Sequence, residues 1–184
     1  MGCWSYAIIG SDDALDWECD LLELAKIDLE NDEANTPLTR ARLEAAIPEL
    51  FAKLDGRLGE RDEERERYNR SIGYQVLGVL LMGAGCTLTE EMREKLVAGS
   101  TNCGEYKMAS LTKEKVRDRL VEVGSTEDEI VSCLRAYDGE RLRGRKAAID
   151  GLVANLREYD IAGGTQLHVE SPSLFDKMAE VLGA

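Results

Sequence analysis

The stretch that decides the fold lies near the start of the chain, where residues 11–31 read SDDALDWECDLLELAKIDLEN. Ser11 is well suited to begin a helix, because its hydroxyl can accept a backbone hydrogen bond from the first turn. Asp12 and Asp13 follow it, and negative charge in a first turn stabilises the helix dipole. Apolar residues then recur at three- and four-residue spacing. The stretch therefore predicts an amphipathic helix that begins after Ser11 and ends near Asn31.

The composition of the chain extends this prediction to a mainly all-α fold. A length of 184 residues is enough for one domain with a substantial core. Glu, Lys, Arg, Leu and Ala are common, only three prolines occur, and runs of Val, Ile and Thr at period two are nearly absent. We expect a single compact helical domain over residues 1–184 with about seven helices. At most one short edge strand is expected, at residues 165–170.

Other helix boundaries are readable along the chain. Thr36-Pro37 begins a second helix, because proline fits the first helical position, and Pro48 is expected to kink or split that helix. A third helix is expected to run from the charged residues 60–70 into an apolar continuation that Gly83-Ala84-Gly85 stops. Residues 87–90, Thr-Leu-Thr-Glu, fit a capping box before a short fourth helix. We expect a loop at residues 98–104.

Two short helices are expected at residues 112–137, joined by a tight turn at Gly124. DNA-binding helix-turn-helix motifs use a similar connection. Here, however, Glu127, Asp128 and Glu129 stand at the start of the second helix, where they would face phosphates. We therefore interpret this hairpin as structural packing.

A basic cluster follows the hairpin, at the start of a helix that is expected to run to Tyr159. Its members are Arg141, Arg143, Arg145 and Lys146. Positive charge at a helix N-terminus is unfavourable for the dipole, so the cluster predicts an acidic partner. The acidic helix at residues 11–31 is a candidate for that partner.

Negative charge is concentrated in one part of the chain. The net charge is −13, and residues 12–33 carry ten acids and one base, a local net charge of −9. Nucleic acids and anionic membranes are disfavoured as ligands, because binding them requires Lys and Arg on the contact face. Basic protein surfaces are favoured. The five cysteines are widely spaced and no signal peptide is recognisable, so we expect a cytoplasmic protein with reduced thiols.

The acid-rich helix is the first candidate for a functional surface. Asp12, Asp16 and Asp20 recur every four residues and should share one face. The residues that we expect to contact a partner are Asp16, Asp20, Glu23 and Asp28. The plain alternative is a solvated face. A single row of carboxylates offers oxygens to a cation from one side only, so we expect no metal and no cofactor here.

Trp4 and Trp17 flank the start of this helix. We interpret them as a structural motif together with Ser11, Asp12 and Asp13, in which both indoles anchor the preceding segment against the helix. The alternative is that an exposed tryptophan serves as a binding hot spot.

The opening Met1-Gly2-Cys3-Trp4, followed by Asp-Asp-Ala-Leu-Asp at residues 12–16, resembles a bacterial family of unknown function. Its members begin Met-Gly-x-Trp-Gly and continue with Asn/Ser-Asp-x-Ala-Leu-Asp. The similarity covers residues 1–25, is weaker at residues 42–54, and departs from the pattern at Ser5, where glycine is common. The resemblance implies a small helical intracellular protein of a bacterium or phage. It implies no activity and no catalytic residues.

Catalytic patterns are weak in this chain. His168 is the single histidine, no Gly-rich phosphate loop occurs, and the five cysteines give no preferred nucleophile. Our leading hypothesis is a non-enzymatic acidic interaction protein, inhibitor- or immunity-like, that docks a basic protein surface. The alternatives are a Cys- or metal-dependent enzyme and a DNA-mimic antagonist of a nucleic-acid-binding protein. The concentration of charge in one helix argues against mimicry over a long surface.

Overall fold

Helix α3 (Glu63–Gly83) is the element around which the other helices pack. The computed structural model describes residues 8–28, 36–56 and 63–159. Residues 71–79 of α3 are all buried, and no charged residue occurs from position 71 to position 83. A helix without charges over such a length can be enclosed on every side, which places α3 at the centre.

The described residues form eight α-helices, so the fold is all-α, as the sequence predicts. The short helix α5 is the one that the sequence does not predict. The strand expected at residues 165–170 lies outside the described residues. The bounds of the helices are α1 (Asp12–Leu24), α2 (Pro37–Asp55), α3 (Glu63–Gly83), α4 (Glu90–Thr101), α5 (Gly104–Met108), α6 (Lys113–Glu122), α7 (Glu127–Ala136) and α8 (Gly139–Glu158).

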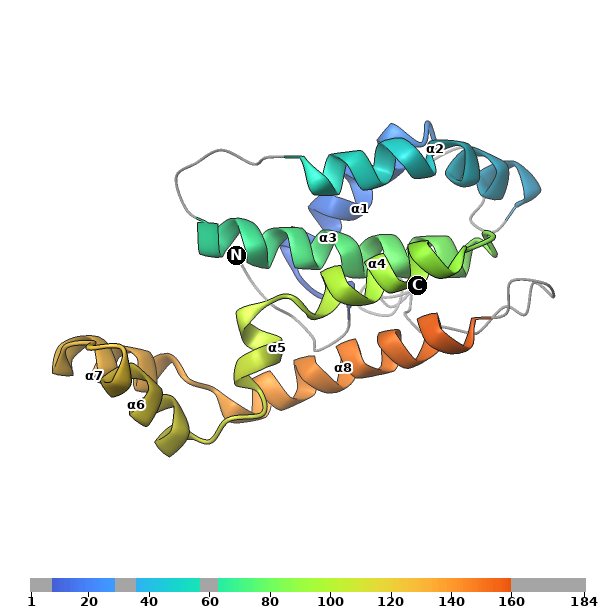
Figure 1. Ribbon diagram of the computed structural model, residues 1–184. Coiled ribbons are helices and arrows are strands. Elements are labelled where there is room, and N and C mark those ends of the chain that lie inside the picture. The colour runs from blue at the N-terminus through green and yellow to red at the C-terminus, as the bar shows by residue number, and fades with distance from the viewer. Residues whose placement is uncertain (1–7, 29–35, 57–62, 160–184) are drawn as a thin grey trace, which may run out of the picture.

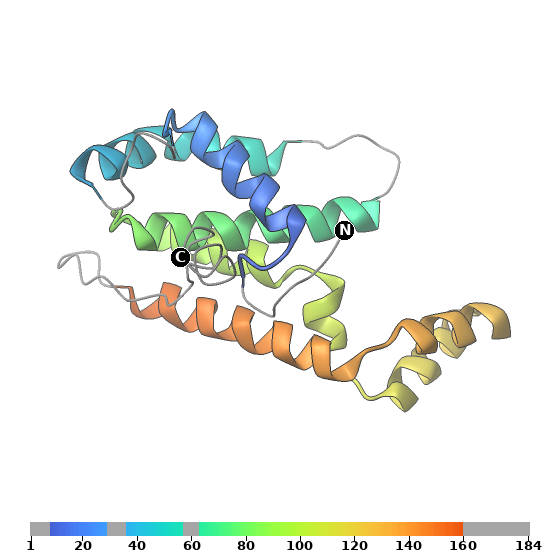
Figure 2. The same cartoon turned by 180° about the vertical axis from the view of Figure 1, so that it is seen from behind.

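The helices lie on two sides of α3. Helices α1 and α2 contact each other and α3, whereas α4 and α8 contact each other and α3 (Figure 1). Seen from behind, α1 lies obliquely beside α2, and α8 runs along the opposite side (Figure 2). Helices α6 and α7 form the predicted hairpin, which extends away from the other helices beyond the start of α8.

The predicted helix starts at Ser11, Thr36 and Thr112 are confirmed, and in the predicted hairpin the second helix begins after Thr126. In each case the hydroxyl accepts a hydrogen bond from a backbone N–H in the first turn, at 3.1–3.4 Å. Each bond satisfies one of the donors that a helix leaves unpaired at its N-terminus. At Thr126 the carboxylate of Glu129 accepts a bond from the backbone N–H in return, which completes a capping box.

The expected end of the first helix near Asn31 is wrong, because α1 ends at Leu24. Lys26 adopts a left-handed conformation with φ of 58°. The N–H of Lys26 donates to Glu23 O and that of Ile27 donates to Leu22 O, both at 2.9 Å. This is a Schellman motif, which satisfies the last carbonyls of a helix and turns the chain. The turn buries Ile27 in the core, and that burial outweighs the strain at a residue that is not glycine.

Of the kink or split expected at Pro48, the split is wrong, because α2 is one continuous helix from Pro37 to Asp55. Pro48 lies in its interior and is exposed. A proline on the solvent side of a helix leaves room for water to replace the lost backbone hydrogen bond. The packing of Leu43, Leu50 and Leu54 in the core holds the two halves in one helix.

The capping box that begins α4 lies two residues later than expected, at Thr89 rather than Thr87. Thr89 accepts a hydrogen bond from Met92 N at 3.2 Å. The loop expected at residues 98–104 is wrong as well, since α4 continues to Thr101. Gly99 lies in this last turn, where an added Cβ would meet the Tyr74 ring at 2.3 Å. The close packing on Tyr74 overrides the low helix propensity of glycine.

A buried polar network joins three helices inside the core. The guanidinium of Arg145 on α8, 7% exposed, donates to Gln75 Oε1 on α3 at 2.6 Å. The Gln75 amide donates in turn to the Ser100 carbonyl of α4 at 2.9 Å. Arg145 also donates to the Ile8 carbonyl at 3.4 Å, which ties the segment before α1 to α8. Buried polar groups must be paired to be tolerated, so this network fixes the relative positions of α3, α4 and α8.

Candidate functional site

The first turn of α1 has the structure that the sequence predicts. Ser11 caps the helix, and Asp12 and Asp13 follow it as half-buried residues. Both carboxylates lie near backbone N–H groups with no partner within the helix, where negative charge stabilises the dipole. These three residues are therefore accounted for by the start of the helix.

Trp17 fixes the inner face of α1. Its side chain is buried, and its Nε1 donates to Asn69 Oδ1 on α3 at 2.9 Å. Its ring contacts the backbone of Gly73, so α1 and α3 approach closely. The described partners of Trp17 therefore lie on α3. Trp4 lies outside the described residues, and the predicted contact of both indoles with the segment before α1 stays a prediction.

The outer face of α1 carries the residues that the sequence singles out for a partner. Asp16, Asp20 and Glu23 are all exposed on this helix. Their spacing of four and three residues places them in one row. Asp20 forms an ion pair with Lys53 of α2 at 3.0 Å, and both side chains are about half exposed. We call Asp16, Asp20 and Glu23 the acidic row.

Two other acids of this region do not belong to the acidic row. Asp28 is exposed, but it follows the turn at Lys26 and so lies beyond the end of α1. Glu18 is half-buried, and burial raises the pKa of its carboxyl above the usual value. The face that a partner can reach is therefore smaller than the run of ten acids suggests.

The basic cluster at the start of α8 finds its described partners elsewhere than the acidic row. Arg141 pairs with Glu105 of α5 at 3.0 Å. Lys146 pairs with Asp150 one turn later and lies over the ring of Tyr106, 4.7 Å from its centroid. The acidic partner of Arg141 is thus on α5 rather than on the first helix.

The cysteines of the described residues differ in burial. Cys86 is buried, and burial raises the pKa of its thiol to about 12, so it stays protonated at neutral pH. Cys103 is buried as well, whereas Cys19 is exposed and Cys133 is half-buried. Cys3 and His168 lie outside the described residues. No group of three or more metal-ligating side chains occurs within residues 8–28, 36–56 and 63–159.

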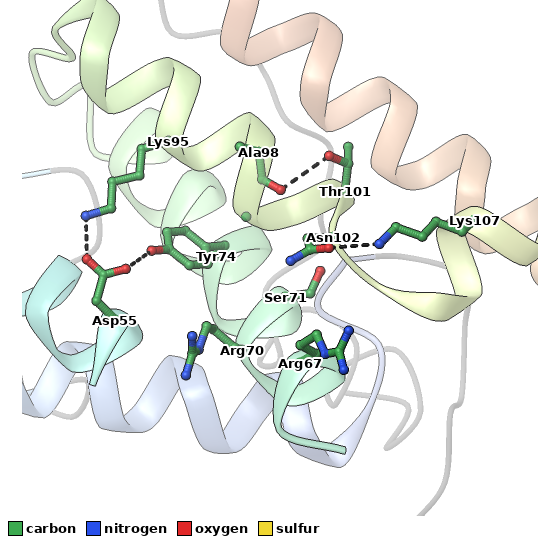
Figure 3. Close-up of a pocket in the computed structure, with 11 residues that line it drawn as sticks. Asp55, Arg67, Arg70, Ser71, Tyr74, Lys95, Ala98, Thr101, Asn102 and Lys107 are labelled. Atoms are coloured by element: carbon green, nitrogen blue, oxygen red, sulfur yellow. Dashed lines mark hydrogen bonds and ion pairs between the residues drawn. The ribbon is translucent and has the colours of Figure 1, made fainter. Parts of the chain in front are cut away.

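An open pocket of about 550 Å³ lies between α3, α4 and α5, and the sequence did not predict it (Figure 3). Four cationic side chains line it, together with one carboxylate, that of Asp55 at the end of α2. The cations are Arg67 and Arg70 of α3, Lys95 of α4 and Lys107 of α5. The lining also includes the hydroxyls of Ser71 and Thr101 and the amide of Asn102.

The carboxylate of Asp55 is engaged on both oxygens. Tyr74 donates to one oxygen and Lys95 to the other, as Figure 3 shows. Although partial burial alone would raise it, the hydrogen bonds from Lys95 and Tyr74 hold the pKa of Asp55 below its usual value. Lys95 also lies over the ring of Phe51, 4.8 Å from its centroid. Asp55, Tyr74 and Lys95 form a fixed wall at one side of the pocket.

The other cations of the pocket differ from Lys95 in their described contacts. Arg70 donates through one terminal nitrogen to the Gly56 carbonyl at 3.2 Å, and its buried Nε has no hydrogen-bond partner. Lys107 donates to Asn102 Oδ1 at 2.9 Å. Both contacts are to neutral oxygens. The sequence signal for this pocket was weak, because its cations come from a mixed-charge run and two other helices.

Among the described residues, no helix has the length and hydropathy needed to cross a membrane. Comparisons with models of protein families, with curated proteins and with solved structures give no match. The resemblance of the N-terminal motif to a bacterial family stays a prediction.

Proposed function

We propose that the protein is a non-enzymatic interaction protein, inhibitor- or immunity-like, that docks a basic protein surface through the outer face of α1. The observation that carries the proposal is the acidic row, three exposed carboxylates on a helix whose opposite face is held in the core. The buried residues of that opposite face are Ala14, Trp17, Leu21 and Leu22. Carboxylates on a fixed helix lose little freedom when they bind, which favours affinity.

The charge of α1 is poorly balanced within its own sequence. The helix carries six acids and no base between Asp12 and Leu24. Lys53 neutralises Asp20, but exposed ion pairs contribute only about 0–1 kcal/mol, so a basic partner can displace it. A field of one sign also increases the rate at which an oppositely charged partner associates.

Exposed leucines at one end of the acidic row favour a protein as the partner. Leu24 follows Asp20 by one turn of α1 and is 39% exposed. Leu38 of α2 is 53% exposed and lies one turn before Arg42, whose guanidinium donates to the Lys26 carbonyl. The two leucines therefore lie near the end of α1. Protein interfaces combine apolar contacts of this kind with charged residues at their rim.

The length of the acidic row argues against mimicry of DNA. Asp16 and Glu23 are seven residues apart, which corresponds to roughly 10 Å along a helix. Duplex DNA presents one charge per about 1.7 Å over a much longer surface. A row of three carboxylates suits a compact basic patch better than a long nucleic-acid channel.

The proposal is tested by reversing the charge of the acidic row. The variant D16K/D20K/E23K is compared with E94K/D118K/E122K, which changes the net charge equally at exposed acids of α4 and α6. Partners are captured from a lysate at low and high salt, identified, purified and measured directly. The reversal at α1 should abolish binding of the partner, whereas the matched control should retain it.

Two outcomes would contradict this function. One is that every purified partner binds the α1 variant as tightly as the original protein. The other is that both variants lose binding equally, which would mean that only the net charge matters. Leu24→Ala adds a second check. High salt screens the charges, so the loss of this apolar side chain should then still weaken binding of the same partner.

A further inference from the structure

The pocket between α3, α4 and α5 has a charge opposite to that of the whole protein. Four cations and one carboxylate give its lining a net charge of +3, in a chain whose net charge is −13. Like charges repel one another across such a short distance, so their convergence is unfavourable without a counter-charge. None of these residues belongs to α1, so this feature is independent of the acidic row.

Two of the cations have donors left over for a ligand. Arg70 uses one terminal nitrogen for the Gly56 carbonyl, and its buried Nε remains without a partner. Lys107 has three donors, and one of them reaches Asn102. Arg70 Nε is enclosed, so the donors that an anion in the pocket can use are the terminal N–H groups of Arg70 and the remaining N–H groups of Lys107.

We propose that this pocket binds a small phosphorylated metabolite, with Arg67, Arg70 and Lys107 contacting its phosphate oxygens. The planar guanidinium of arginine matches the spacing of phosphate oxygens and binds them in pairs, and a lysine ammonium adds a point charge. Asn102 lies in the same lining, and its side-chain NH₂ can donate a further hydrogen bond, whereas the Thr101 hydroxyl already donates within α4 (Figure 3).

The volume of the pocket favours a small molecule as its ligand. A volume of about 550 Å³ lies inside the usual range for sites that bind metabolites and cofactors. The Lys95–Asp55–Tyr74 wall closes one side with a carboxylate that is already paired. The ligand would therefore meet the cations of α3 and α5 rather than Lys95, whose ammonium already pairs with Asp55.

The field of the whole protein disfavours a nucleic acid at this site. A long polyanion would extend beyond the pocket over a protein whose net charge is −13. Charges more than about 10 Å apart are largely screened at 0.1 M salt, so a small anion inside the pocket responds mainly to its four cations. The net charge of the protein therefore disfavours a nucleic acid more than a metabolite with one or two phosphates.

Titration calorimetry with inorganic phosphate, pyrophosphate and ADP tests this site, and citrate and a short single-stranded RNA serve as competing probes. The variant R67Q/K107Q is compared with K115Q/R117Q, which removes two exposed positive charges from α6 instead. Pyrophosphate or ADP should bind the pocket variant at least about tenfold more weakly, whereas the control should bind as the original protein does. Amide NMR signals of Thr101 and Asn102 should shift on binding.

The proposal is overturned if no phosphate probe binds at concentrations up to about 10 mM, which corresponds to very weak affinity. Equal weakening in the pocket variant and the control would overturn it too, because the effect would then be one of net charge. Citrate binding as tightly as pyrophosphate would assign the pocket to carboxylates, and tighter RNA binding would assign it to a nucleic acid. Lys107→Gln alone, at an exposed position, repeats the test if the double variant does not fold.

Discussion

The indole of Trp17 lies directly against the backbone of Gly73, where α1 crosses α3. A Cβ added at position 73 would come within 2.9 Å of the indole and within 2.5 Å of the Leu54 side chain. Both neighbours are buried, so neither can move aside freely. The glycine thus sets the distance between the helix that carries the acidic row and the central helix.

Gly73→Ala should therefore lower the free energy of unfolding by about 1–3 kcal/mol, the usual effect of overpacking a core. Gly151→Ala is the matched control, because Gly151 is exposed in the middle of α8 and a Cβ there meets nothing within 4 Å. The control should raise stability by about 0.5–1 kcal/mol. Urea unfolding measures both, and equal effects at the two positions would contradict the close contact.

Lys26→Gly should stabilise the protein by about 0.5–1 kcal/mol, because glycine adopts the left-handed conformation without a steric penalty. The main-chain hydrogen bonds of the turn do not depend on the lysine side chain. Gly124→Ala provides the opposite change, since Gly124 has φ of 79° and should lose stability. A Lys26→Gly variant less stable than the original in urea would show that the lysine side chain has a role of its own.

Arg145 and Gln75 should be energetically coupled. Arg145→Met leaves Gln75 Oε1 without its 2.6 Å partner inside the core, and Gln75→Leu leaves the guanidinium with one fewer acceptor. Each single variant should lose about 1–3 kcal/mol of stability. The double variant R145M/Q75L should lose less than the sum of the two, by about 0.5–3 kcal/mol. A double-mutant cycle in urea measures this, and strict additivity would contradict the coupling.

Glu18 should make stability depend on pH. Its pKa is raised in the folded state, so the native protein holds the proton more tightly than the unfolded chain does. The stabilising effect of that proton is fully present below the unfolded pKa of about 4.3 and is lost as pH rises through the folded value. Glu18→Gln should therefore be more stable than the original protein at neutral pH, and the difference should disappear in acid.

The cysteines should differ in reactivity as their burial indicates. Cys19 is exposed and should react with iodoacetamide in the native protein, whereas Cys86 and Cys103 should react only after unfolding. The high pKa of Cys86 adds to its protection, because the thiolate is the reactive form. Mass spectrometry of the labelled peptides gives the order. Rapid modification of Cys86 in the native state would contradict this order and would favour the hypothesis of a cysteine-dependent enzyme.

The sequence predicted a helix boundary correctly where the type of a single residue determines that boundary. Ser11, Thr36 and Thr112 supply capping oxygens at the positions that the sequence indicates. Gly85 and Gly124 supply the left-handed conformation that ends a helix. Lys26 ends α1 in the same geometry, but its residue type gives no such signal. The burial of Ile27, which is a tertiary effect, decides that boundary.

The acidic row was predictable and the pocket was not, for the same physical reason. Asp16, Asp20 and Glu23 share one helix, so their spacing alone places them on one face. The cations of the pocket come from α3, α4 and α5, and only the packing of those helices brings them together. Gly99, which lets α4 approach Tyr74, lies in a segment that the sequence assigns to a loop.

The hairpin of α6 and α7 contributes no residue to the hydrophobic core, and Val116 is its one buried residue among the side chains described there. A unit with so little buried contact opens at a low free energy, whereas α3 opens only when the whole molecule unfolds. The amide hydrogens of the hairpin should therefore exchange with solvent long before those of α3. The stability of this protein is then described by two free energies, one for opening the hairpin and one for unfolding α3 together with the helices that surround it.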